Sequence, residues 1–317
     1  MMLLLADAIL PVFGLVALGY LAGLTGYLSA ETSDGLSDFA VGVAMPLLLF
    51  ETMRGVDLGG GAPWALWATY FVAAAIAWTA GHLAVTRVFG RDSQAGVVGG
   101  AATAFSNLVL LGIPFMQRVY GQEGFEVLSL LVAVHLPLMI MTSIVLFHFF
   151  GSGTGEPAGP LRLARNFARR ILKNPLIVGI LLGLLWRLSG LPLPDVLGRL
   201  VDALAGVAGP VALFAMGLGL RKFGLSGQVA PALLLSALKL LLMPAVALGA
   251  ALLLGLPPLT AKVAVAAAAL PSGVNSYLIA THFGTGQALA SNQLIIATAC
   301  AALTTAFWLT VSQMVFG

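Results

Sequence analysis

The sequence predicts an all-α integral membrane protein of ten transmembrane helices arranged as two inverted halves. Hydrophobic residues make up 60% of the 317 residues and charged residues only 9%, which is too little polar surface to cover a soluble protein of this size. The apolar residues gather in ten segments, each near the length of about 20 residues that crosses a bilayer. An internal repeat relates the first five segments to the last five.

Short loops separate nearly all of the predicted helices, so nothing remains for a soluble domain. The first segment lacks a basic start and a small-residue cleavage site, and we expect a retained helix there instead of a signal peptide. Cys300 is the single cysteine, which excludes an internal disulfide and a cysteine metal cluster. The predicted spans cover residues 4–26, 35–53, 64–89, 95–119, 124–150, 174–190, 196–220, 229–254, 259–283 and 287–315.

Basic residues indicate the orientation of the chain. When loops are assigned alternately to the two sides, nine Lys and Arg residues fall on one side and five on the other. The positive-inside rule places the richer side in the cytoplasm. We therefore expect a multi-pass protein of the cell (inner) membrane with both termini outside and a basic cytoplasmic linker, residues 151–172. The basic run of this linker is interpreted as contacting anionic lipid, so no nucleic-acid partner is expected.

The internal repeat appears when the sequence is shifted against itself by 164 residues. Matched prolines, glycines and one aspartate carry the evidence, because apolar residues match by chance. A shift of 168 residues continues the register and brings Asn107 onto Asn275. Each half, residues 1–150 and 173–317, has an odd number of helices, so the halves run in opposite directions, as in many secondary transporters. The pairs are Pro11/Pro175, Gly19/Gly183, Gly26/Gly190, Asp38/Asp202, Gly42/Gly206, Pro46/Pro210 and Phe50/Phe214.

Two repeat-related helices are interrupted at mid-depth. The ninth contains Leu270-Pro271-Ser272-Gly273-Val274-Asn275-Ser276, and the fourth contains Ala104-Phe105-Ser106-Asn107-Leu108 followed by Gly112-Ile113-Pro114. Such residues leave backbone groups without helical partners. Two broken helices that cross near the midplane direct two half-helix N-termini, each about half a positive charge, at one point, which favours an anion. The alternative is that small residues here only permit close helix packing.

These motifs, with Asn174-Pro175 and Gly209-Pro210-Val211-Ala212-Leu213-Phe214, resemble the auxin efflux carrier family over nearly the whole chain. The short linker is similar to that of bacterial permeases for malonate and related carboxylates, and differs from the long loop of plant PIN carriers. The resemblance implies a fold of the sodium/proton antiporter and bile-acid symporter type. It also implies a scaffold of helices 1, 2, 6 and 7, through which a homodimer forms, and a moving transport domain of helices 3–5 and 8–10.

The resemblance further implies a substrate site where the broken helices cross. Asn107 matches an asparagine that faces the substrate carboxylate, and Pro271 matches the proline of the ninth helix. Ser106 stands where the plant carriers have a proline, so we expect a softer break in the fourth helix. The predicted substrate-binding residues are Ser106, Asn107, Pro271, Ser272, Gly273 and Asn275.

Lys239 lies about ten residues into a predicted helix, where a charge costs several kcal/mol unless it is paired or neutral. The family that the chain resembles has a lysine here, which the plant carriers pair with an aspartate of the third helix, but residues 64–89 contain no carboxylate. Lys239 is therefore expected to bind crossover carbonyls or Asn and Ser side chains as a fixed charge that replaces a coupling cation, or to lose its proton. His135, inside the fifth helix, either meets the crossover in a coupling role or is a hydrogen-bonded core residue.

Another group of candidates surrounds the prolines of the predicted helices. Pro114 follows the break in the fourth helix, and the others lie on the scaffold helices. They either line the apolar part of a substrate pocket or serve ordinary packing. These scaffold candidates are Pro46, Phe50, Pro210, Phe214 and Met216.

No zinc-binding, phosphate-binding or nucleophile motif occurs in the sequence, so we expect no enzyme activity, cofactor or metal. The predicted function is secondary transport of small organic anions, namely carboxylates, across the lipid bilayer by elevator-type alternating access. Proton coupling, sodium coupling and uniport stay open. The alternatives are a cation-coupled exchanger or symporter on the same fold, and a non-transporting sensor or scaffold that binds a lipid or metabolite.

Overall fold

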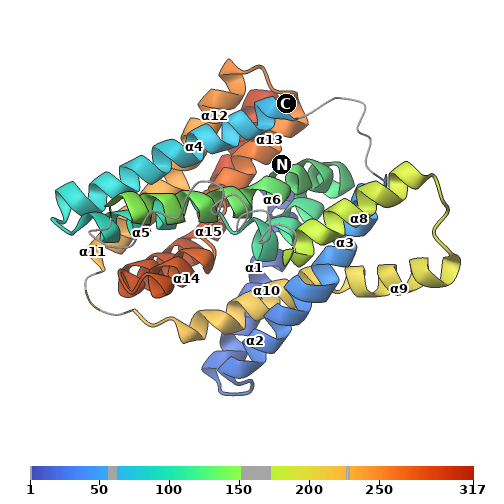
Figure 1. Ribbon diagram of the computed structural model, residues 1–317, viewed down its shortest axis with the longest axis horizontal. Coiled ribbons are helices and arrows are strands. Elements are labelled where there is room, and N and C mark those ends of the chain that lie inside the picture. The colour runs from blue at the N-terminus through green and yellow to red at the C-terminus, as the bar shows by residue number, and fades with distance from the viewer. Residues whose placement is uncertain (1, 56–62, 151–172, 226, 228) are drawn as a thin grey trace.

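The computed structural model describes residues 2–55, 63–150, 173–225, 227 and 229–317, and places most of them in helices (Figure 1). Within these ranges no strand forms, and the single β-bridge joins Ser106 to Ser272. Six described helices are long and apolar enough to cross a membrane, and three shorter ones are also apolar. The prediction of an all-α membrane protein is confirmed at this level. The six cover Glu31–Gly55, Trp64–Val88, Leu108–Phe150, Asp195–Lys222, Ala230–Leu253 and Gln287–Phe316.

The first half of the chain follows the predicted helices with two shifts. The second helix begins at Ala30 instead of residue 35, directly after the extended backbone of Ser29. The predicted gap at residues 120–123 is a kink at Gly121, whose positive φ of 65° suits a residue without a side chain. The elements are α1 (Met2–Leu24), α2 (Ala30–Phe39), η1 (Ala40–Ala44), α3 (Met45–Gly55), α4 (Trp64–Leu83), η2 (Ala84–Val88), α5 (Ser93–Ala104), η3 (Leu108–Gly112) and α6 (Ile113–Phe150).

In the second half of the chain, two of the predicted helices are each divided into two. The predicted helix 196–220 is split at Val207, which allows Pro210 to lie in the first turn of α10, where a missing N–H costs little. The predicted helix 259–283 is split at residues 270–274. The elements are α8 (Pro175–Ser189), α9 (Asp195–Gly206), α10 (Ala208–Gly219), η4 (Leu220–Lys222), α11 (Ala230–Ala237), η5 (Leu238–Leu242), α12 (Met243–Leu253), α13 (Pro258–Ala269), α14 (Asn275–His282) and α15 (Gln287–Phe316).

Three helices widen into a π-turn shortly before a proline. The turns η1, η3 and η5 end two residues before Pro46, Pro114 and Pro244, respectively. A proline inside an α-helix lacks the N–H for the carbonyl four residues earlier and collides with it. The extra residue of a π-turn displaces that carbonyl, and such turns are frequent at functional sites.

The internal repeat reappears as a packing contact that the chain makes twice. Helix α1 lies along α10, and α3 lies along α8. A Cβ atom on Gly19 would lie 2.1 Å from the carbonyl oxygen of Phe214, and one on Gly183 would lie 2.5 Å from that of Phe50. The two contacts pair the residues that the shift of 164 aligns. Only glycine allows the helix backbones to approach this closely.

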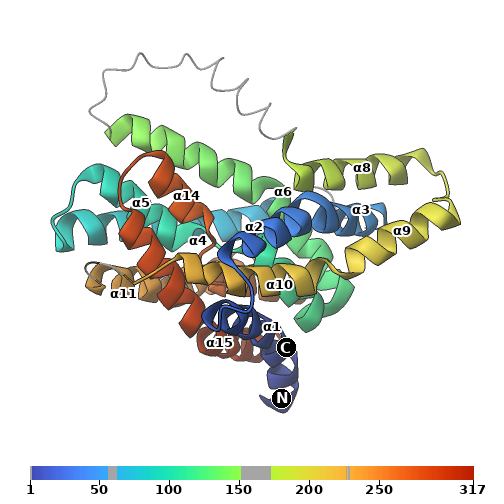
Figure 2. The same cartoon turned by 90° about the horizontal axis from the view of Figure 1, so that it is seen from below.

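Helix α13 contacts α4, α6, α12 and α15. These helices form a group beside the one that contains α2, α3, α8, α9 and α10 (Figures 1 and 2). Every residue of α13 from Val263 onward is at most 1% exposed. A helix that is apolar on all sides is expected at such a buried position. Its run of alanines permits neighbours to approach on every face.

Replacing Gly19 with alanine should lower the free energy of unfolding by about 1–3 kcal/mol, because the added methyl group forces the backbones of α1 and α10 apart. Gly14→Ala is the matched control on the same helix, since nothing lies within 4 Å of its Cβ position. The control should be neutral or slightly stabilising, because alanine favours helix. Thermal unfolding in detergent measures both. Equal melting temperatures for the two variants would contradict the close contact.

Candidate functional site

The two helix interruptions meet and satisfy each other's backbone. The N–H of Asn107 donates to the carbonyl of Pro271 at 2.9 Å, and the N–H of Gly273 donates to the carbonyl of Phe105 at 3.2 Å. Ser106 and Ser272 form the antiparallel bridge between the two strand-like segments. Hydrocarbon tolerates irregular backbone only where protein or a cavity receives its polar groups. Here each break serves as the partner of the other.

Four helix ends converge at this meeting point. Helices α5 and α13 end there, at Ala104 and Ala269, while η3 begins at Leu108 and α14 begins at Asn275. The first N–H groups of a helix have no partner within it and carry a partial positive charge, and the last carbonyls carry the opposite charge. The meeting point therefore has one electropositive and one electronegative pair of helix ends.

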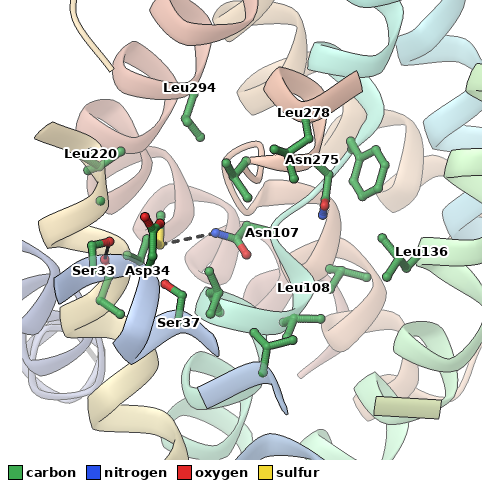
Figure 3. A pocket seen from close by; sticks show the side chains of 18 of the residues that line it. Ser33, Asp34, Ser37, Asn107, Leu108, Leu136, Leu220, Asn275, Leu278 and Leu294 are labelled. Carbon is green, nitrogen blue, oxygen red and sulfur yellow. Dashed lines mark hydrogen bonds between the residues drawn. The ribbon is translucent and has the colours of Figure 1, made fainter. Parts of the chain in front are cut away.

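A cavity of about 410 Å³ lies beside the breaks, against the two helix starts. Asn107 and Asn275 both line it and extend into it from opposite segments (Figure 3). Asn107 donates from Nδ2 to the thioether sulfur of Met216 at 3.3 Å. A thioether is a weak acceptor, so this amide is available to a stronger one. Leucines, Phe105 and Met216 form an apolar part of the wall.

The opposite wall of the cavity comes from residues that sequence reasoning missed. Ser33, Asp34 and Ser37 of α2 line the cavity, and Asp34 forms an ion pair with Lys222 at the end of η4. Ser33 also donates to the carbonyl of Ala215 at 3.1 Å, which ties α2 to α10. With Asp38, these residues recur at three- and four-residue spacings and so share one helix face. From the sequence alone, that spacing could have indicated a polar face on this helix.

Lys239 lies in the π-turn η5, behind the breaks, and is 0% exposed. Its Nζ donates to Ser106 Oγ at 2.7 Å, to the carbonyl of Ala268 at 2.8 Å and to Met243 Sδ at 3.0 Å. All three partners are uncharged. Ala268 belongs to the last turn of α13, so the Lys239 nitrogen lies at an electronegative helix end.

The other predicted residues of the ninth-helix break lie behind the cavity. Ser272 Oγ donates to the carbonyl of Ala102 and accepts from Gln293 Nε2 at 2.8 Å. Pro271 supplies the carbonyl that Asn107 binds, and Gly273 supplies the N–H bound by Phe105. These three residues are buried and are absent from the cavity wall as described, whereas Ser106, Asn107 and Asn275 line it.

His135 of α6 also lines the cavity and is 3% exposed. Its ring is surrounded by the rings of Phe105, Tyr70 and Phe71, with centroids 5.0, 5.4 and 6.5 Å away. Neither ring nitrogen has a hydrogen-bond partner among the described residues. The histidine therefore carries unused hydrogen-bonding capacity at the cavity wall.

Of the scaffold candidates, Met216 alone lines this cavity in the described part of the chain. Pro114 and Pro210 line a second cavity of about 530 Å³, next to Gln117 and Arg118. The backbone of Pro46 packs against Gly179, because a Cβ atom on Gly179 would lie 2.3 Å from the carbonyl oxygen of Pro46. The carbonyls of Phe50 and Phe214 form the repeated glycine contacts. The described residues contain no group of three or more His, Cys, Asp or Glu that could hold a metal.

Comparison with known proteins gives matches along nearly the whole chain. A family model described as membrane transport protein matches residues 4–309. The chain is 27% identical to an "Uncharacterized transporter" of Methanothermobacter thermautotrophicus, over 95% of this chain and 96% of the relative. It is 28% identical to the "Putative malonate transporter" of Rhizobium meliloti, over 92% and 90% of the two chains. It is 23% identical to "Auxin efflux carrier component 8" of Arabidopsis thaliana, over 87% and 89%.

The family match and the apolar helices together identify a multi-pass membrane protein of a transporter family. The expected resemblance to the auxin efflux carriers is confirmed by both the family model and the plant relative. A family of transporters agrees with the expectation that the chain is not an enzyme. The chain belongs to the membrane transport protein family, which includes the auxin efflux carriers.

Proposed function

We propose that the protein is a secondary carrier of small organic anions and binds the substrate carboxylate where the two helix breaks meet. The observation that carries this proposal is the cavity into which η3 and α14 direct their first turns and Asn107 and Asn275 their amides. Helix N-termini bind anions through free N–H groups and partial positive charge. An anionic oxygen would replace the Met216 sulfur as the acceptor of the Asn107 amide.

Lys239 is proposed to act as a fixed positive charge in place of a coupling cation. Its three hydrogen bonds use all the donors of an ammonium group. It occupies the electronegative side of the meeting point and leaves the cavity side to the helix N-termini. Ser106 links the two sides, because its hydroxyl binds Lys239 and its neighbour Asn107 lines the cavity.

The substrate class is proposed from the chemistry of the cavity together with the relatives. One anion-binding end, with apolar wall between it and the polar residues of α2, suits a small organic carboxylate. The Rhizobium meliloti relative is named for malonate. We therefore take malonate and other short carboxylates as the first substrates to test.

Alternating access is proposed for the architecture that the internal repeat predicts. In this proposal ten helices form inverted repeats 1–150 and 173–317, with helices 1, 2, 6 and 7 as scaffold and 3–5 and 8–10 as a moving domain. The glycine contacts made once by α1 with α10 and again by α8 with α3 support the repeat. The two cavities support access from two sides of the membrane. One is next to Lys222 and the other is next to Arg118, and the distribution of basic residues assigns these two residues to opposite faces.

The protein is proposed to lie in the cell (inner) membrane with both termini outside. The start of α1 and the end of α15 lie close together in both views, which supports a common side (Figures 1 and 2). The linker 151–172 lies outside the described residues, and its cytoplasmic location rests on its basic charge. A homodimer through the scaffold helices and a coupling ion remain part of the same proposal.

Replacing Asn107 or Asn275 with alanine should abolish carboxylate counterflow in proteoliposomes, because each variant removes an amide donor from the anion site. A thermal-shift screen over mono- and dicarboxylates, including malonate, first selects the substrate. Thr304→Ala, at a half-buried position of α15 where the hydroxyl bonds carbonyls of its own helix, is the control and should transport normally.

Wild-type counterflow in both asparagine variants would reject the site. Ligand binding without counterflow in the wild-type protein would favour the sensor alternative over a carrier.

Ser106→Ala should lower the free energy of unfolding by about 1.5–3 kcal/mol, because it deprives a buried ammonium group of one hydrogen bond. Ser129→Ala is the control, since its buried hydroxyl binds only the Phe125 carbonyl of its own helix. Thermal unfolding in detergent compares the variants. If both lose the same stability, Lys239 does not depend on Ser106.

The proposed orientation is tested by labelling with a membrane-impermeant maleimide in a Cys300→Ser background. Gly317→Cys should react in intact cells, because the C-terminus is outside. Arg87→Cys, in η2 at the proposed cytoplasmic face, should react only after permeabilisation. The reverse pattern would invert the topology.

A further inference from the structure

We infer that His135 binds a second oxygen-bearing group of the substrate, so that the preferred substrates are short dicarboxylates instead of simple monocarboxylates. This inference rests on the proposed function and adds a specificity-determining residue to the same cavity. In it, one carboxylate lies at Asn107 and Asn275, and the other end of the substrate lies at the imidazole.

The first step is the unused capacity of the ring. A neutral imidazole has one donor and one acceptor, and neither nitrogen of His135 has a partner among the described residues. Buried polar groups in native proteins are nearly always hydrogen-bonded, because an unsatisfied one costs free energy. His135 lines the cavity, so a molecule that fills the cavity is the partner that we assign to the imidazole.

The second step concerns what can fill it. A bound water needs two to four polar partners, and the rings of Phe105 and Phe71 beside the imidazole offer none. The polar groups close to it are the Tyr70 hydroxyl, which also lacks a partner among the described residues, and the Ser106 hydroxyl, which accepts from Lys239 and keeps its own O–H. A polar group held covalently by the substrate does not require such a set of partners. It needs only the imidazole and the shape of the cavity.

The third step identifies the group as an acidic oxygen. The aromatic residue beside the ring, Phe105, directly precedes Ser106, whose hydroxyl binds the buried ammonium of Lys239. Positive charge on this side of the cavity favours an oxygen anion over a cation or an amine. A carboxyl group also matches imidazole in both of its states, accepting from an N–H when ionised and donating to the bare nitrogen when protonated.

The experiment compares malonate with propionate, which has the same number of carbons and lacks the second carboxylate. Apparent affinities come from counterflow in proteoliposomes and from thermal shifts of the purified full-length protein. His135→Phe keeps an aromatic ring and removes the hydrogen bond, while His135→Gln keeps hydrogen-bonding groups. His148→Phe is the matched control, because it makes the same substitution at an exposed position of the same helix.

Wild-type protein should prefer malonate to propionate. His135→Phe should weaken malonate binding about tenfold, as expected for one hydrogen bond to a charged group, and should change propionate binding less than about twofold. His135→Gln should retain most of the preference, and His148→Phe all of it. His135→Leu makes the same comparison if the phenylalanine variant does not fold.

Equal effects on malonate and propionate, or a wild-type preference for propionate, would overturn the role of His135 while leaving anion transport intact. A wild-type protein that responds to no carboxylate at all would instead reject the proposed function. The two failures are therefore distinguishable in one set of measurements.

Discussion

The backbone hydrogen bonds between the two helix breaks are the constraint on which the rest of the site depends. At membrane depth, each break alone would expose carbonyl and N–H groups that cost several kcal/mol each when unsatisfied. The pairing of Asn107 with Pro271 and of Gly273 with Phe105 removes that cost. It also fixes the direction of four helix ends, so that the same bonds that stabilise the fold aim two helix starts at the cavity.

Charge at the meeting point is divided between its two sides. Behind the breaks, the ends of α5 and α13 are electronegative, and the Lys239 side chain donates there to the Ala268 carbonyl. In front, Leu108 and Asn275 at the starts of η3 and α14 line the cavity. The fixed positive charge proposed for Lys239, with its neutral ligands, would therefore favour an anion nearby.

The sequence predicted the breaks themselves but not all of their surroundings. Pro271 and Gly273 interrupt a helix by their own chemistry, whereas the break at Ser106 contains no proline and was found only through the repeat that aligns Asn107 with Asn275. For Lys239 the sequence predicted only the kinds of partner, namely carbonyls and Asn or Ser side chains. It did not identify Ser106 and Ala268, because both lie in segments remote from Lys239 in the sequence. The cavity wall on α2 was missed, because the polar face of α2 becomes part of a cavity only through the packing of α2 against α10. The kink at Gly121 and the helix end at Val207 depend on local backbone geometry, which cannot be inferred from amino-acid composition.

The ion pair between Asp34 and Lys222 has a consequence for how solute enters. It joins α2 to the end of η4 at the cavity wall, and the Asp34 side chain is 71% exposed. Exposed pairs contribute about 0–1 kcal/mol, so this one shifts the equilibrium toward contact between α2 and η4 by no more than about fivefold at room temperature. The pair is thus a weak link between the two helices, and salt at physiological ionic strength, with a screening length of about 8 Å, weakens it further. Thermal fluctuation alone is therefore enough to break it.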